Sequence, residues 1–484
     1  MKVVFIQNIL SYNFGIAYLN AILRSKGIET DLFIIPLEDK IVQRIIQAKP
    51  DLIGIGCVTG EQDLYLELIS EIKKNYQVPV VIGGPHATYH SEDLCKQPGV
   101  DYVCIGEGEQ AILELCYSLA SNKDGKDVHN MCMFRGGKII KNPMAPLVED
   151  LDSLPFPNID FYFKYSFFRK YTEIPIVTTR GCPWNCGFCY NAQKQAIYKG
   201  LGKYTRMRSP EKVIAELKER LVNKNIKSVI LWDDIIGINK KWMSDFCENY
   251  ASEIKLPFFS SIRADLINDF NLSLLKKANC YCLSVGVESG DSFLRNKILG
   301  KKLENKSLLD AGDLVRKYGI KLRTSNMFML PEENFEKALS TVNLNREMGV
   351  AVPFAYILQP YPGTPIYDYI VQNNLLKDDF GFESLDPLGI SYSSIKVDDI
   401  DKIKTIYRLF YYMVKSKFLY KLILSKIDKI KPEKFLVRIA HKLSLFILYC
   451  KAHNIGYLNG LKITWIYWRI SRNARKGNNL LSKI

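Results

Sequence analysis

The sequence predicts an α/β protein with two successive parallel-sheet regions and a helical C-terminal region. Short apolar runs alternate with amphipathic stretches through the first ~145 residues. A second alternating series follows a proline-rich interruption, and basic stretches of helical periodicity end the chain. The 484 residues, 47% apolar and 24% charged, suit two to three globular domains. We expect regions over 1–145, 172–375 and 376–484, with a linker over 146–171.

The first region is predicted to be a doubly wound parallel sheet. Between its strands lie amphipathic stretches such as QDLYLELISEIKKN, in which Leu64, Leu68 and Ile72 share one helical face. Open parallel sheets bind ligands beyond the carboxyl ends of their strands, so the loops there are candidate ligand contacts. The expected strands are KVVFI, TDLFII, DLIGIGC, VPVVIGG and DYVCIG.

Four of these loops carry glycine or polar residues, at 8–15, 57–60, 83–88 and 106–109. Glycine lets a backbone approach a ligand closely, although a tight strand-to-helix turn explains any one of these loops equally well. Four such loops at one edge favour a ligand cleft. The candidate cofactor contacts are Tyr12, Thr59, Gly83, Gly84, Gly106 and Glu107.

The second region is predicted to be a partial barrel of six β/α units. Its active site should lie at the carboxyl ends of the strands, and a loop with three cysteines, TTRGCPWNCGFCYN, follows the first of them. The expected strands lie near 174–179, 228–232, 258–262, 281–287, 321–330 and 352–359.

The spacing of Cys182, Cys186 and Cys189 is typical of a metal centre. A structural zinc site closes with four protein ligands, and a cubane iron–sulfur cluster has four irons to ligate. Either a distant fourth ligand completes the site, or one position is left for a ligand that is not protein. A zinc knuckle and chance proximity are the alternatives. Candidates for a distant ligand are Cys247, Cys280, Cys282 and a histidine.

The pattern Cys182-x3-Cys186-x2-Cys189, with Phe188 before the last cysteine, resembles the signature of the radical S-adenosylmethionine (SAM) superfamily. This resemblance implies that the three cysteines bind a [4Fe-4S] cluster and that SAM chelates its fourth iron. It also implies that the reduced cluster cleaves SAM to methionine and a 5′-deoxyadenosyl radical, and that Phe188 lies beside the adenine.

Further segments resemble cobalamin-dependent radical SAM enzymes over residues 1–375. IGGPHATYHSEDLCKQPGVDYVCIGEGEQAILEL is similar to their cobalamin-binding domain, and RMRSPEKVIAELK, LWDDIIGIN, SVGVESGDSFLRNKI and PYPGTPIYD are similar to successive barrel segments. By position, Arg263 and Glu288 are expected to contact the carboxylate and the ammonium or ribose hydroxyls of SAM. A surface salt bridge is the alternative for either residue.

Two departures from the family's pattern are visible. Where many cobalamin proteins have Asp-x-His-x-x-Gly after the first strand, this chain has IQNILSYNFG, so we expect cobalamin without a lower histidine ligand. His86, in the GGPH turn, is interpreted as structural. The family's Gly-x-Pro-Gly-Glu stretch appears as MLPEEN, in which Met329 and Glu332 replace the two glycines.

The resemblance implies a radical SAM enzyme, with a cobalamin-dependent methyltransferase acting on an unactivated carbon as the leading hypothesis. A radical cyclase or an oxidative rearrangement enzyme is the first alternative, and a non-catalytic iron–sulfur or cobalamin-binding protein is the second. The expected partners are a small-molecule or lipid-like substrate and an electron donor such as flavodoxin or ferredoxin.

The net charge of +15 is concentrated at the end of the chain. Residues 401–484 hold 19 Lys and Arg against three acids, whereas residues 1–400 hold 47 against 48. In this segment Tyr407, Phe410, Tyr411 and Val414 can share a helical face, with Lys415 and Lys417 pointing outward. This pattern favours contact with an anionic membrane surface, a helical cap on the barrel being an equal alternative. Nucleic-acid binding ranks below both, since no recognisable nucleic-acid module accompanies the charge.

A cytoplasmic location, peripheral to the membrane if the basic segment binds lipid, is the expectation for this chain. KVVFIQN directly after Met1 does not resemble a signal peptide, and no apolar run is long enough to span a bilayer. Twelve cysteines, sparsely and unevenly placed, favour a reducing compartment and metal or catalytic use.

Overall fold

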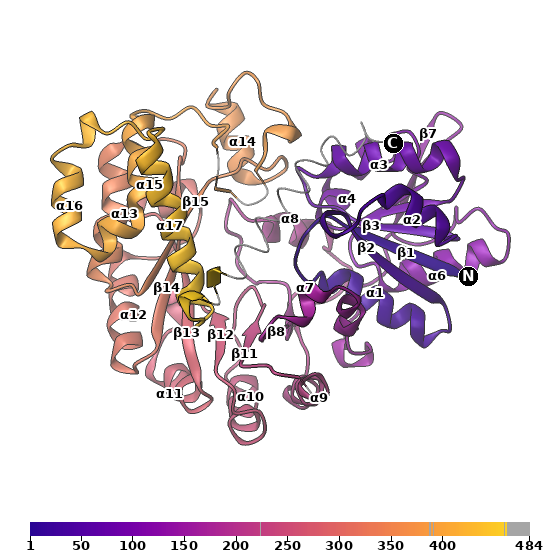
Figure 1. The fold of residues 1–484 in the computed structure, drawn as a ribbon, viewed down its shortest axis with the longest axis horizontal. Coiled ribbons are helices and arrows are strands. Elements are labelled where there is room, and N and C mark those ends of the chain that lie inside the picture. The colour runs from indigo at the N-terminus through magenta and orange to yellow at the C-terminus, as the bar shows by residue number, and fades with distance from the viewer. Residues whose placement is uncertain (223, 387–388, 391, 459, 462–484) are drawn as a thin grey trace. The chain divides into compact units, whose positions relative to one another are not determined.

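The computed structural model describes residues 1–222, 224–386, 389–390, 392–458 and 460–461 (Figure 1). These residues divide into two compact units. The first comprises Met1–Tyr171 together with Tyr198–Lys203. The second comprises Thr172–Ile197 and the described chain from Tyr204 onward.

The first unit is built on a seven-stranded sheet in the order β2-β1-β3-β4-β5-β6-β7. Neighbouring strands from β2 to β5 pair in parallel, which confirms the predicted doubly wound sheet. The carboxyl ends of β1, β3, β4 and β5 therefore share one edge. The strands are β1 (Lys2–Gln7), β2 (Glu29–Ile34), β3 (Leu52–Gly56), β4 (Val80–Gly83), β5 (Tyr102–Cys104), β6 (Met131–Arg135) and β7 (Lys138–Lys141).

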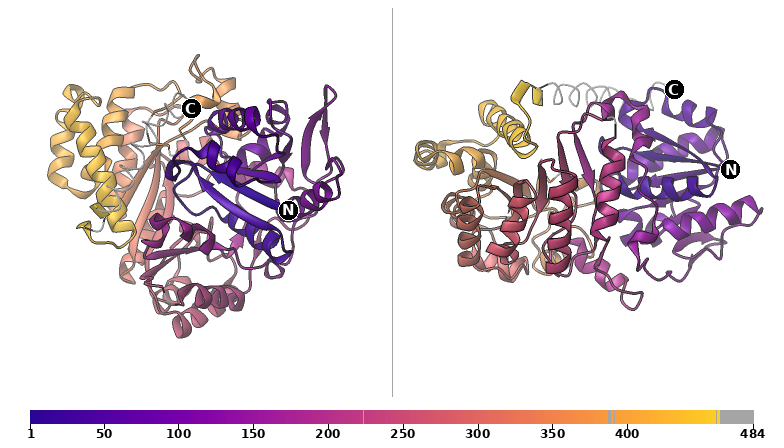
Figure 2. Two further views of the ribbon diagram at one scale, coloured as in Figure 1. Left: turned by 45° about the vertical axis from the view of Figure 1, so that its right-hand side comes forward. Right: turned by 90° about the horizontal axis from the view of Figure 1, so that it is seen from below.

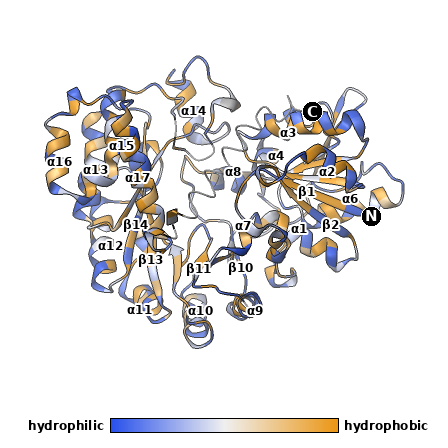
Figure 3. Ribbon diagram, viewed as in Figure 1, coloured by the Kyte–Doolittle hydropathy of each residue, from blue (hydrophilic) through white to orange (hydrophobic). Residues whose placement is uncertain are grey.

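Helices cover both faces of this sheet because the central strands are apolar on both faces. Along β1, Val3 and Phe5 point into one core cluster, whereas Val4 and Ile6 point into the other. Figure 3 shows these central strands largely in the hydrophobic colour. α1, α6 and α7 pack on the first face, and α2 to α5 on the second. The helices are α1 (Phe14–Ser25), α2 (Ile41–Gln47), α3 (Gln62–Asn75), α4 (Pro85–Tyr89), α5 (Ser91–Leu94), α6 (Glu109–Ala120) and α7 (Ser166–Arg169).

A hairpin that sequence analysis missed extends this sheet. β6 pairs antiparallel with β5 and with β7. Gly136 and Gly137 connect the hairpin with φ of 55° and 76°, the left-handed pair that a two-residue hairpin turn requires. The dipeptide Gly-Gly between MCMFR and KIIK was the signal that could have revealed it.

The second unit carries a six-stranded, all-parallel sheet in the order β15-β14-β13-β12-β11-β8. Its strands match all six expected runs, which confirms the partial barrel; the views of Figure 2 show this curved sheet with its helices. The strands are β8 (Glu173–Ile176), β11 (Ser228–Leu231), β12 (Phe258–Ser261), β13 (Cys280–Glu288), β14 (Lys321–Phe328) and β15 (Val352–Ile357).

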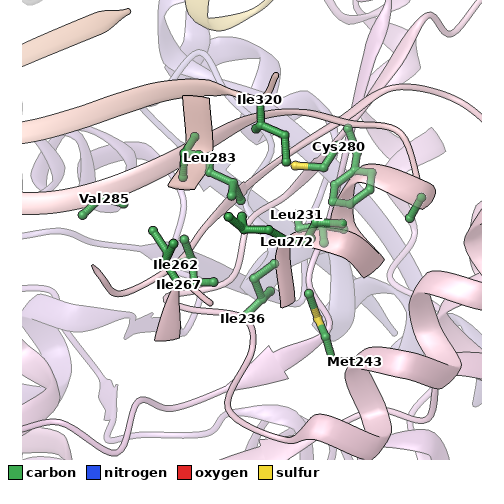
Figure 4. Packing of buried hydrophobic residues seen from close by; sticks show 14 of the residues in the cluster. Leu231, Ile236, Met243, Ile262, Ile267, Leu272, Cys280, Leu283, Val285 and Ile320 are labelled. Atoms are coloured by element: carbon green, nitrogen blue, oxygen red, sulfur yellow. The ribbon is translucent and has the colours of Figure 1, made fainter. Parts of the chain in front are cut away.

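A large apolar cluster holds the helices to this sheet. In Figure 4, Leu231, Leu283 and Val285 from the strands gather with Met243 of α10 and Leu272 of α11. This packing fixes where each strand ends, and hence where the loops at the carboxyl edge begin. The helices are α9 (Pro210–Leu221), α10 (Lys240–Glu253), α11 (Asp269–Lys277), α12 (Asn305–Lys317), α13 (Phe335–Glu347) and α14 (Pro365–Gln372).

The predicted helical C-terminal region consists of α15 (Ile400–Lys415), α16 (Lys417–Leu424) and α17 (Phe435–Ala452) within the described chain. Three of the four residues of the expected apolar face of α15 are buried: Tyr407, Phe410 and Val414 join a core cluster with residues of α13, β14 and β15. The fourth, Tyr411, is only partly buried and packs against a separate small cluster. Lys415 does not simply extend outward, because its Nζ donates to the Val350 carbonyl at 2.8 Å. None of the helices in the described ranges is long and apolar enough to span a bilayer. The packing of α15 against β14 and β15 is that of a cap on this part of the barrel.

Candidate active site

The three-cysteine loop lies between β9 (Thr179–Arg180) and α8 (Tyr190–Ile197). Cys182, Cys186 and Cys189 are partly exposed, whereas the other nine cysteines of the chain are buried. The distant fourth-ligand candidates are among the buried ones: Cys247 and Cys280 lie in the large apolar cluster, and Cys282 is fully buried. The structure thus leaves the three cysteines of the loop partly exposed and keeps the three alternative cysteines in the core.

Burial keeps these thiols protonated in the absence of a metal. It raises the pKa of Cys182 to about 11, and it also raises the pKa of Cys189. Burial raises the pKa of Cys186 as well, but the nearby cations Lys301 and Arg263 oppose that shift. Since a bound metal displaces the thiol proton, cations beside Cys186 favour the thiolate form that binds metal.

Asp233, which follows β11, anchors the start of the cysteine loop. Its buried carboxylate accepts four hydrogen bonds from Thr178 and Thr179. Oδ1 accepts from both backbone N–H groups, at 2.8 and 2.6 Å, and from the Thr179 hydroxyl at 2.9 Å. Oδ2 accepts from the Thr178 hydroxyl at 2.9 Å. The path of the chain into the loop is therefore fixed by a neighbouring strand.

The next residue, Asp234, anchors the other end of the loop. Its Oδ2 accepts from Asn191 Nδ2 at 3.1 Å, and the same amide lies 3.5 Å from Cys189 Sγ. The Tyr204 hydroxyl donates to the Asn191 Oδ1 at 2.5 Å. One Asp-Asp dipeptide thus holds both ends of the loop, and Asn191 presents an N–H group to a candidate ligand sulfur.

Arg263 and Glu288, predicted as SAM contacts, lie close to this loop and are both buried. Arg263 stands over the Trp184 ring at 5.1 Å, and its Nη2 donates to the Lys301 carbonyl at 2.6 Å. Glu288 has a left-handed backbone, φ 64°, and its Oε1 pairs with Lys301 Nζ at 2.5 Å. Lys301 Nζ is also 6.0 Å from the Phe188 ring centroid. The salt-bridge alternative that was considered for both residues stays open for Arg263, whose Nε pairs with the exposed Asp265 carboxylate at 2.9 Å. The Glu288–Lys301 pair is buried and is not a surface salt bridge.

Lys301, Asp233 and Asp234 were not predicted as site residues. Lys301 belongs to a segment whose position depends on packing after β13, and no local pattern marks it. The two aspartates lie in the LWDDIIGIN segment, so a polar pair directly after an apolar strand was the available signal.

The MLPEEN turn keeps a left-handed backbone at the two positions where the family's stretch has glycine. Met329 and Glu332 both have φ of 60°, in the left-handed region that ordinarily favours glycine. The buried Glu333 carboxylate accepts from the Leu330 N–H at 3.1 Å, and burial raises its pKa to about 8. The substitution thus preserves the turn at a cost in backbone strain.

In the first unit, the predicted residues of β3 and β4 form one closely packed group at the carboxyl edge. Thr59 Oγ1 lies 3.2 Å from Nδ1 of His86, whose buried ring has its pKa lowered to about 4 by burial. Gly84 has φ 97°, and a Cβ there would come within 2.8 Å of the Cys57 carbonyl oxygen. Gly83 precedes it at the end of β4. Only glycine at Gly84 lets these two loops approach so closely.

The remaining predicted residues of this unit lie on adjoining loops. Tyr12 packs in an aromatic group with Tyr162 and Phe168, at 5.3 and 5.0 Å between ring centroids. Gly106 has φ 78°, and its N–H donates to the Thr88 hydroxyl oxygen. Glu107 Oε2 accepts from the Val148 N–H at 3.2 Å.

Glu61 adds a polar group that sequence analysis did not select. Its Oε1 accepts from Asn8 Nδ2 at 3.0 Å, whereas its Oε2 is buried without a hydrogen-bond partner among the described residues. Burial raises the pKa of this carboxyl group. A buried acceptor without a partner at a ligand-binding edge suits a ligand rich in amide N–H groups, and cobalamin carries such amides around its ring.

The residues of the cysteine loop also fit the group that the motif implies. They supply three soft thiol donors, two nearby cations and an amide N–H aimed at one sulfur. Within the described ranges, no three His, Cys, Asp or Glu side chains are arranged to hold a single metal ion. A zinc ion would require thiolates at about 2.3 Å from one point, whereas each cysteine of a cubane cluster binds a different iron.

Two family models match the chain. A B12 binding domain matches residues 10–116, and the radical SAM superfamily matches residues 176–344. The chain is 29% identical over 377 residues to an uncharacterized methyltransferase, PH0819, of Pyrococcus horikoshii, covering 75% of this chain and 79% of the relative. It is 24% identical over 414 residues to an anaerobic magnesium-protoporphyrin IX monomethyl ester cyclase of Rubrivivax gelatinosus, covering 82% and 73%.

The fold is also similar to that of a solved enzyme. The cobalamin-dependent S-adenosylmethionine radical enzyme OxsB, solved with aqua-cobalamin and S-adenosylmethionine bound, superposes with a TM-score of 0.68 at 16% identity. The match covers 99% of this chain and 80% of OxsB. The chain therefore carries a B12-binding domain and a radical SAM superfamily domain, in an architecture similar to that of a cobalamin-dependent radical SAM enzyme.

Proposed function

We propose that this protein transfers a methyl group to an unactivated carbon of a small-molecule substrate. The observation that supports this most is the loop of three partly exposed cysteines, held at the carboxyl edge of a parallel sheet in a chain that also carries a B12-binding domain. When bound, the cofactors supply the 5′-deoxyadenosyl radical and the methyl group. The protein's task is to bind, orient and shield them.

Cys182, Cys186 and Cys189 are proposed to ligate the [4Fe-4S] cluster. Lys301 and Arg263 lie beside Cys186 and offset the negative charge that three thiolates bring into a partly buried loop. Asn191 donates its amide N–H toward Cys189 Sγ, and hydrogen bonds to cluster sulfurs raise the reduction potential.

Phe188, Arg263 and Glu288 are proposed to bind SAM. Phe188 packs at the edge of an apolar cluster and offers a flat surface for the adenine. Arg263 and Glu288 supply opposite charges, as the carboxylate and ammonium of an amino acid require. Glu288 is paired with Lys301 in this structure, so a SAM ammonium would share that carboxylate with the lysine.

The loops with Tyr12, Thr59, Gly83, Gly84, Gly106 and Glu107 are proposed to bind cobalamin without a histidine below the cobalt. Burial and the Thr59 contact hold the His86 ring within the protein. Electron paramagnetic resonance of the cob(II)alamin form tests this assignment. Nitrogen superhyperfine splitting that disappears in His86→Ala would identify His86 as a ligand and contradict it.

Anaerobic reconstitution tests the cluster assignment. We expect about four irons and four sulfides per chain. The triple substitution of Cys182, Cys186 and Cys189 by alanine should abolish the cluster's absorbance and all SAM cleavage, whereas the control Cys116→Ala, a buried thiol of α6, should retain both. Full iron in the triple variant, or zinc without iron in freshly purified anaerobic protein, would contradict the assignment.

A radical cyclase or rearrangement enzyme is the second candidate, because a magnesium-protoporphyrin ester cyclase aligns over 82% of this chain. The mass of the product separates the two functions, since methylation adds one carbon. Anaerobic incubation with dithionite, SAM and host extract fractions, followed by mass spectrometry, provides that measurement. Deoxyadenosine formation distinguishes both from a non-catalytic cofactor-binding protein.

We further propose that flavodoxin or ferredoxin reduces the cluster, and that the basic C-terminal region contacts an anionic membrane surface from the cytoplasmic side. The charge of that region supports the contact, with 19 Lys and Arg against three acids in residues 401–484. Truncation near Val397 would also remove α15, which completes the barrel core, so point substitutions are the better test.

A further inference from the structure

We propose that α17 and a cationic pocket at its N-terminal end form a binding site for the phosphate of an anionic phospholipid at a membrane surface. This inference rests on the proposed peripheral membrane contact and assigns it to particular residues. It does not depend on the reaction that the enzyme catalyses.

The pocket encloses about 340 Å³ and is lined by four cations: Lys377, Lys404, Arg408 and Arg438. Glu433 is the one carboxylate among its lining residues, and both of its oxygens accept from Arg408 Nη2, at 2.9 and 3.1 Å. Lys377 Nζ donates to the Ser393 carbonyl at 2.6 Å. The lining residues thus leave a clear excess of positive charge in a concave site, which suits a phosphate.

Lys404 and Arg438 are the two cations of this pocket that are most available to bind an anion. Neither forms an ion pair within the described ranges. Arg408 and Glu433 satisfy each other, so a bound anion need not compete with Glu433 for Lys404 or Arg438. An anion held by both would gain two charge-assisted contacts.

α17 carries an exposed apolar stripe directly after the pocket. Phe435, Leu436, Ile439 and Leu443 are 75%, 76%, 44% and 49% exposed. They fall within about one third of the helical circumference at 100° per residue. No other element of the described chain buries them, and apolar surface of this extent favours contact with a lipid or a protein partner.

The other faces of α17 are occupied differently. One face is held to α15: the Tyr412 hydroxyl donates to the Ala440 carbonyl at 3.0 Å, and Ser444 and Leu448 are buried. Beside the exposed stripe, Lys434, Arg438 and Lys442 recur every four residues and form a basic stripe. The helix contains no Asp or Glu.

This order of faces suits a helix that lies in the plane of a membrane. The apolar stripe can enter the acyl boundary, while the adjacent cations extend to the phosphate level. Arg438 belongs to both the basic stripe and the pocket, so the pocket opens where a headgroup phosphate would lie. Each cation near an anionic surface strengthens binding by about fivefold. A nucleic acid would leave the apolar stripe uncovered.

Co-sedimentation of the reconstituted full-length protein with vesicles tests the proposal. The vesicles contain phosphatidylcholine alone or phosphatidylcholine with phosphatidylglycerol. The charge variant is Lys404→Gln with Arg438→Gln, and the stripe variant is Leu436→Ser with Ile439→Ser. The control, Lys276→Gln with Lys277→Gln, removes two exposed lysines of α11 in the same unit. Circular dichroism and iron content verify that each variant folds.

We expect the wild type and the control to bind anionic vesicles equally, and to bind neutral vesicles far more weakly. The charge variant should bind anionic vesicles about 25-fold more weakly, as two cations at about fivefold each imply. The stripe variant should lose binding to both kinds of vesicle.

Three results would overturn the proposal, and they can be distinguished from one another. Site variants that bind like the wild type would place the membrane contact elsewhere in the chain. A wild type that binds no vesicles would contradict the membrane contact itself, and binding of free glycerol phosphate would then identify the pocket as a site for soluble anions. A dimer in analytical ultracentrifugation that the stripe variant abolishes would identify a second copy as the occupant. Methyl transfer is measured separately, so its failure bears only on the proposed reaction.

Discussion

Replacing Asp233 by asparagine separates the charge of this side chain from its hydrogen bonds. The asparagine Oδ1 can accept from the Thr178 and Thr179 N–H groups and the Thr179 hydroxyl, as the carboxylate does. Its Nδ2 can donate to the Thr178 hydroxyl oxygen, since a hydroxyl both donates and accepts. The variant therefore keeps four hydrogen bonds and loses a buried negative charge.

The pKa of Asp233 gives the expected magnitude. Burial raises it to about 6 from the ordinary 3.8, against the opposing effect of the four donors. Because the unfolded chain ionises first, the folded state loses stability as the pH rises from about 4 to about 6. The total loss is about 3 kcal/mol, of which about 1.4 kcal/mol falls between pH 5 and pH 7.5.

Urea unfolding of the second unit at the two pH values measures this effect. Trp184, Trp232 and Trp242 lie in this unit. Trp465 and Trp468, which lie outside the described residues, are replaced by phenylalanine in both proteins so that tryptophan fluorescence follows this unit. The stability of Asp233→Asn relative to the wild type should increase by about 1.4 kcal/mol from pH 5 to pH 7.5. Other groups titrate in both proteins and cancel in the comparison. Asp233→Ala, which leaves four donors without an acceptor, should be destabilised by about 3 kcal/mol and retain less iron.

A relative stability that is unchanged or falls with rising pH would refute this reasoning. It would show that the four donors outweigh burial and hold the carboxylate charged in the folded state. Equal iron retention by the alanine variant would show that the anchor at the start of the loop does not position the cysteines.

Three further substitutions test other features of the fold. Glu216→Gln removes the buried carboxylate that pairs with the guanidiniums of Arg208 and Arg220, and should lower the free energy of unfolding by about 3–5 kcal/mol in denaturant titration. A loss below about 1 kcal/mol would contradict the importance of this buried triad. Glu332→Gly relieves a left-handed backbone at an exposed position but loses the hydrogen bond that Glu332 accepts from the Tyr369 hydroxyl. Glu332→Ala loses the same hydrogen bond and keeps the strain, so the glycine variant should be more stable than the alanine variant by about 0.5 kcal/mol, seen as a higher melting temperature. Gly84→Ala sets a Cβ 2.8 Å from a carbonyl oxygen, so cobalamin retention on gel filtration should fall, and wild-type retention would argue against this loop as a binding element.

Local sequence patterns were enough to predict much of the fold. Alternation along β1 and glycine at strand ends depend on neighbouring residues, so the parallel strands could be predicted without knowledge of packing. The hairpin of β6 and β7 had a local signal in its Gly-Gly turn, whereas its attachment to β5 could not be predicted, because a helix separates β5 from β6 in the sequence. The left-handed backbone of Met329 and Glu332 was also hidden, since side chains other than glycine do not reveal it in a sequence.

The sequence by itself indicated a metal centre at three cysteines, because their spacing is contained in eight consecutive residues. The resemblance of this motif to the radical SAM signature implied the class of enzyme and the cluster. Only the tertiary structure decided what surrounds them. Asp233, Asp234 and Lys301 reach the loop from other strands and segments, through packing that no local pattern encodes. Packing also decided which face of the C-terminal region is free: α15 buries its apolar face against the barrel, and α17 leaves an apolar stripe exposed, although both helices are amphipathic in sequence.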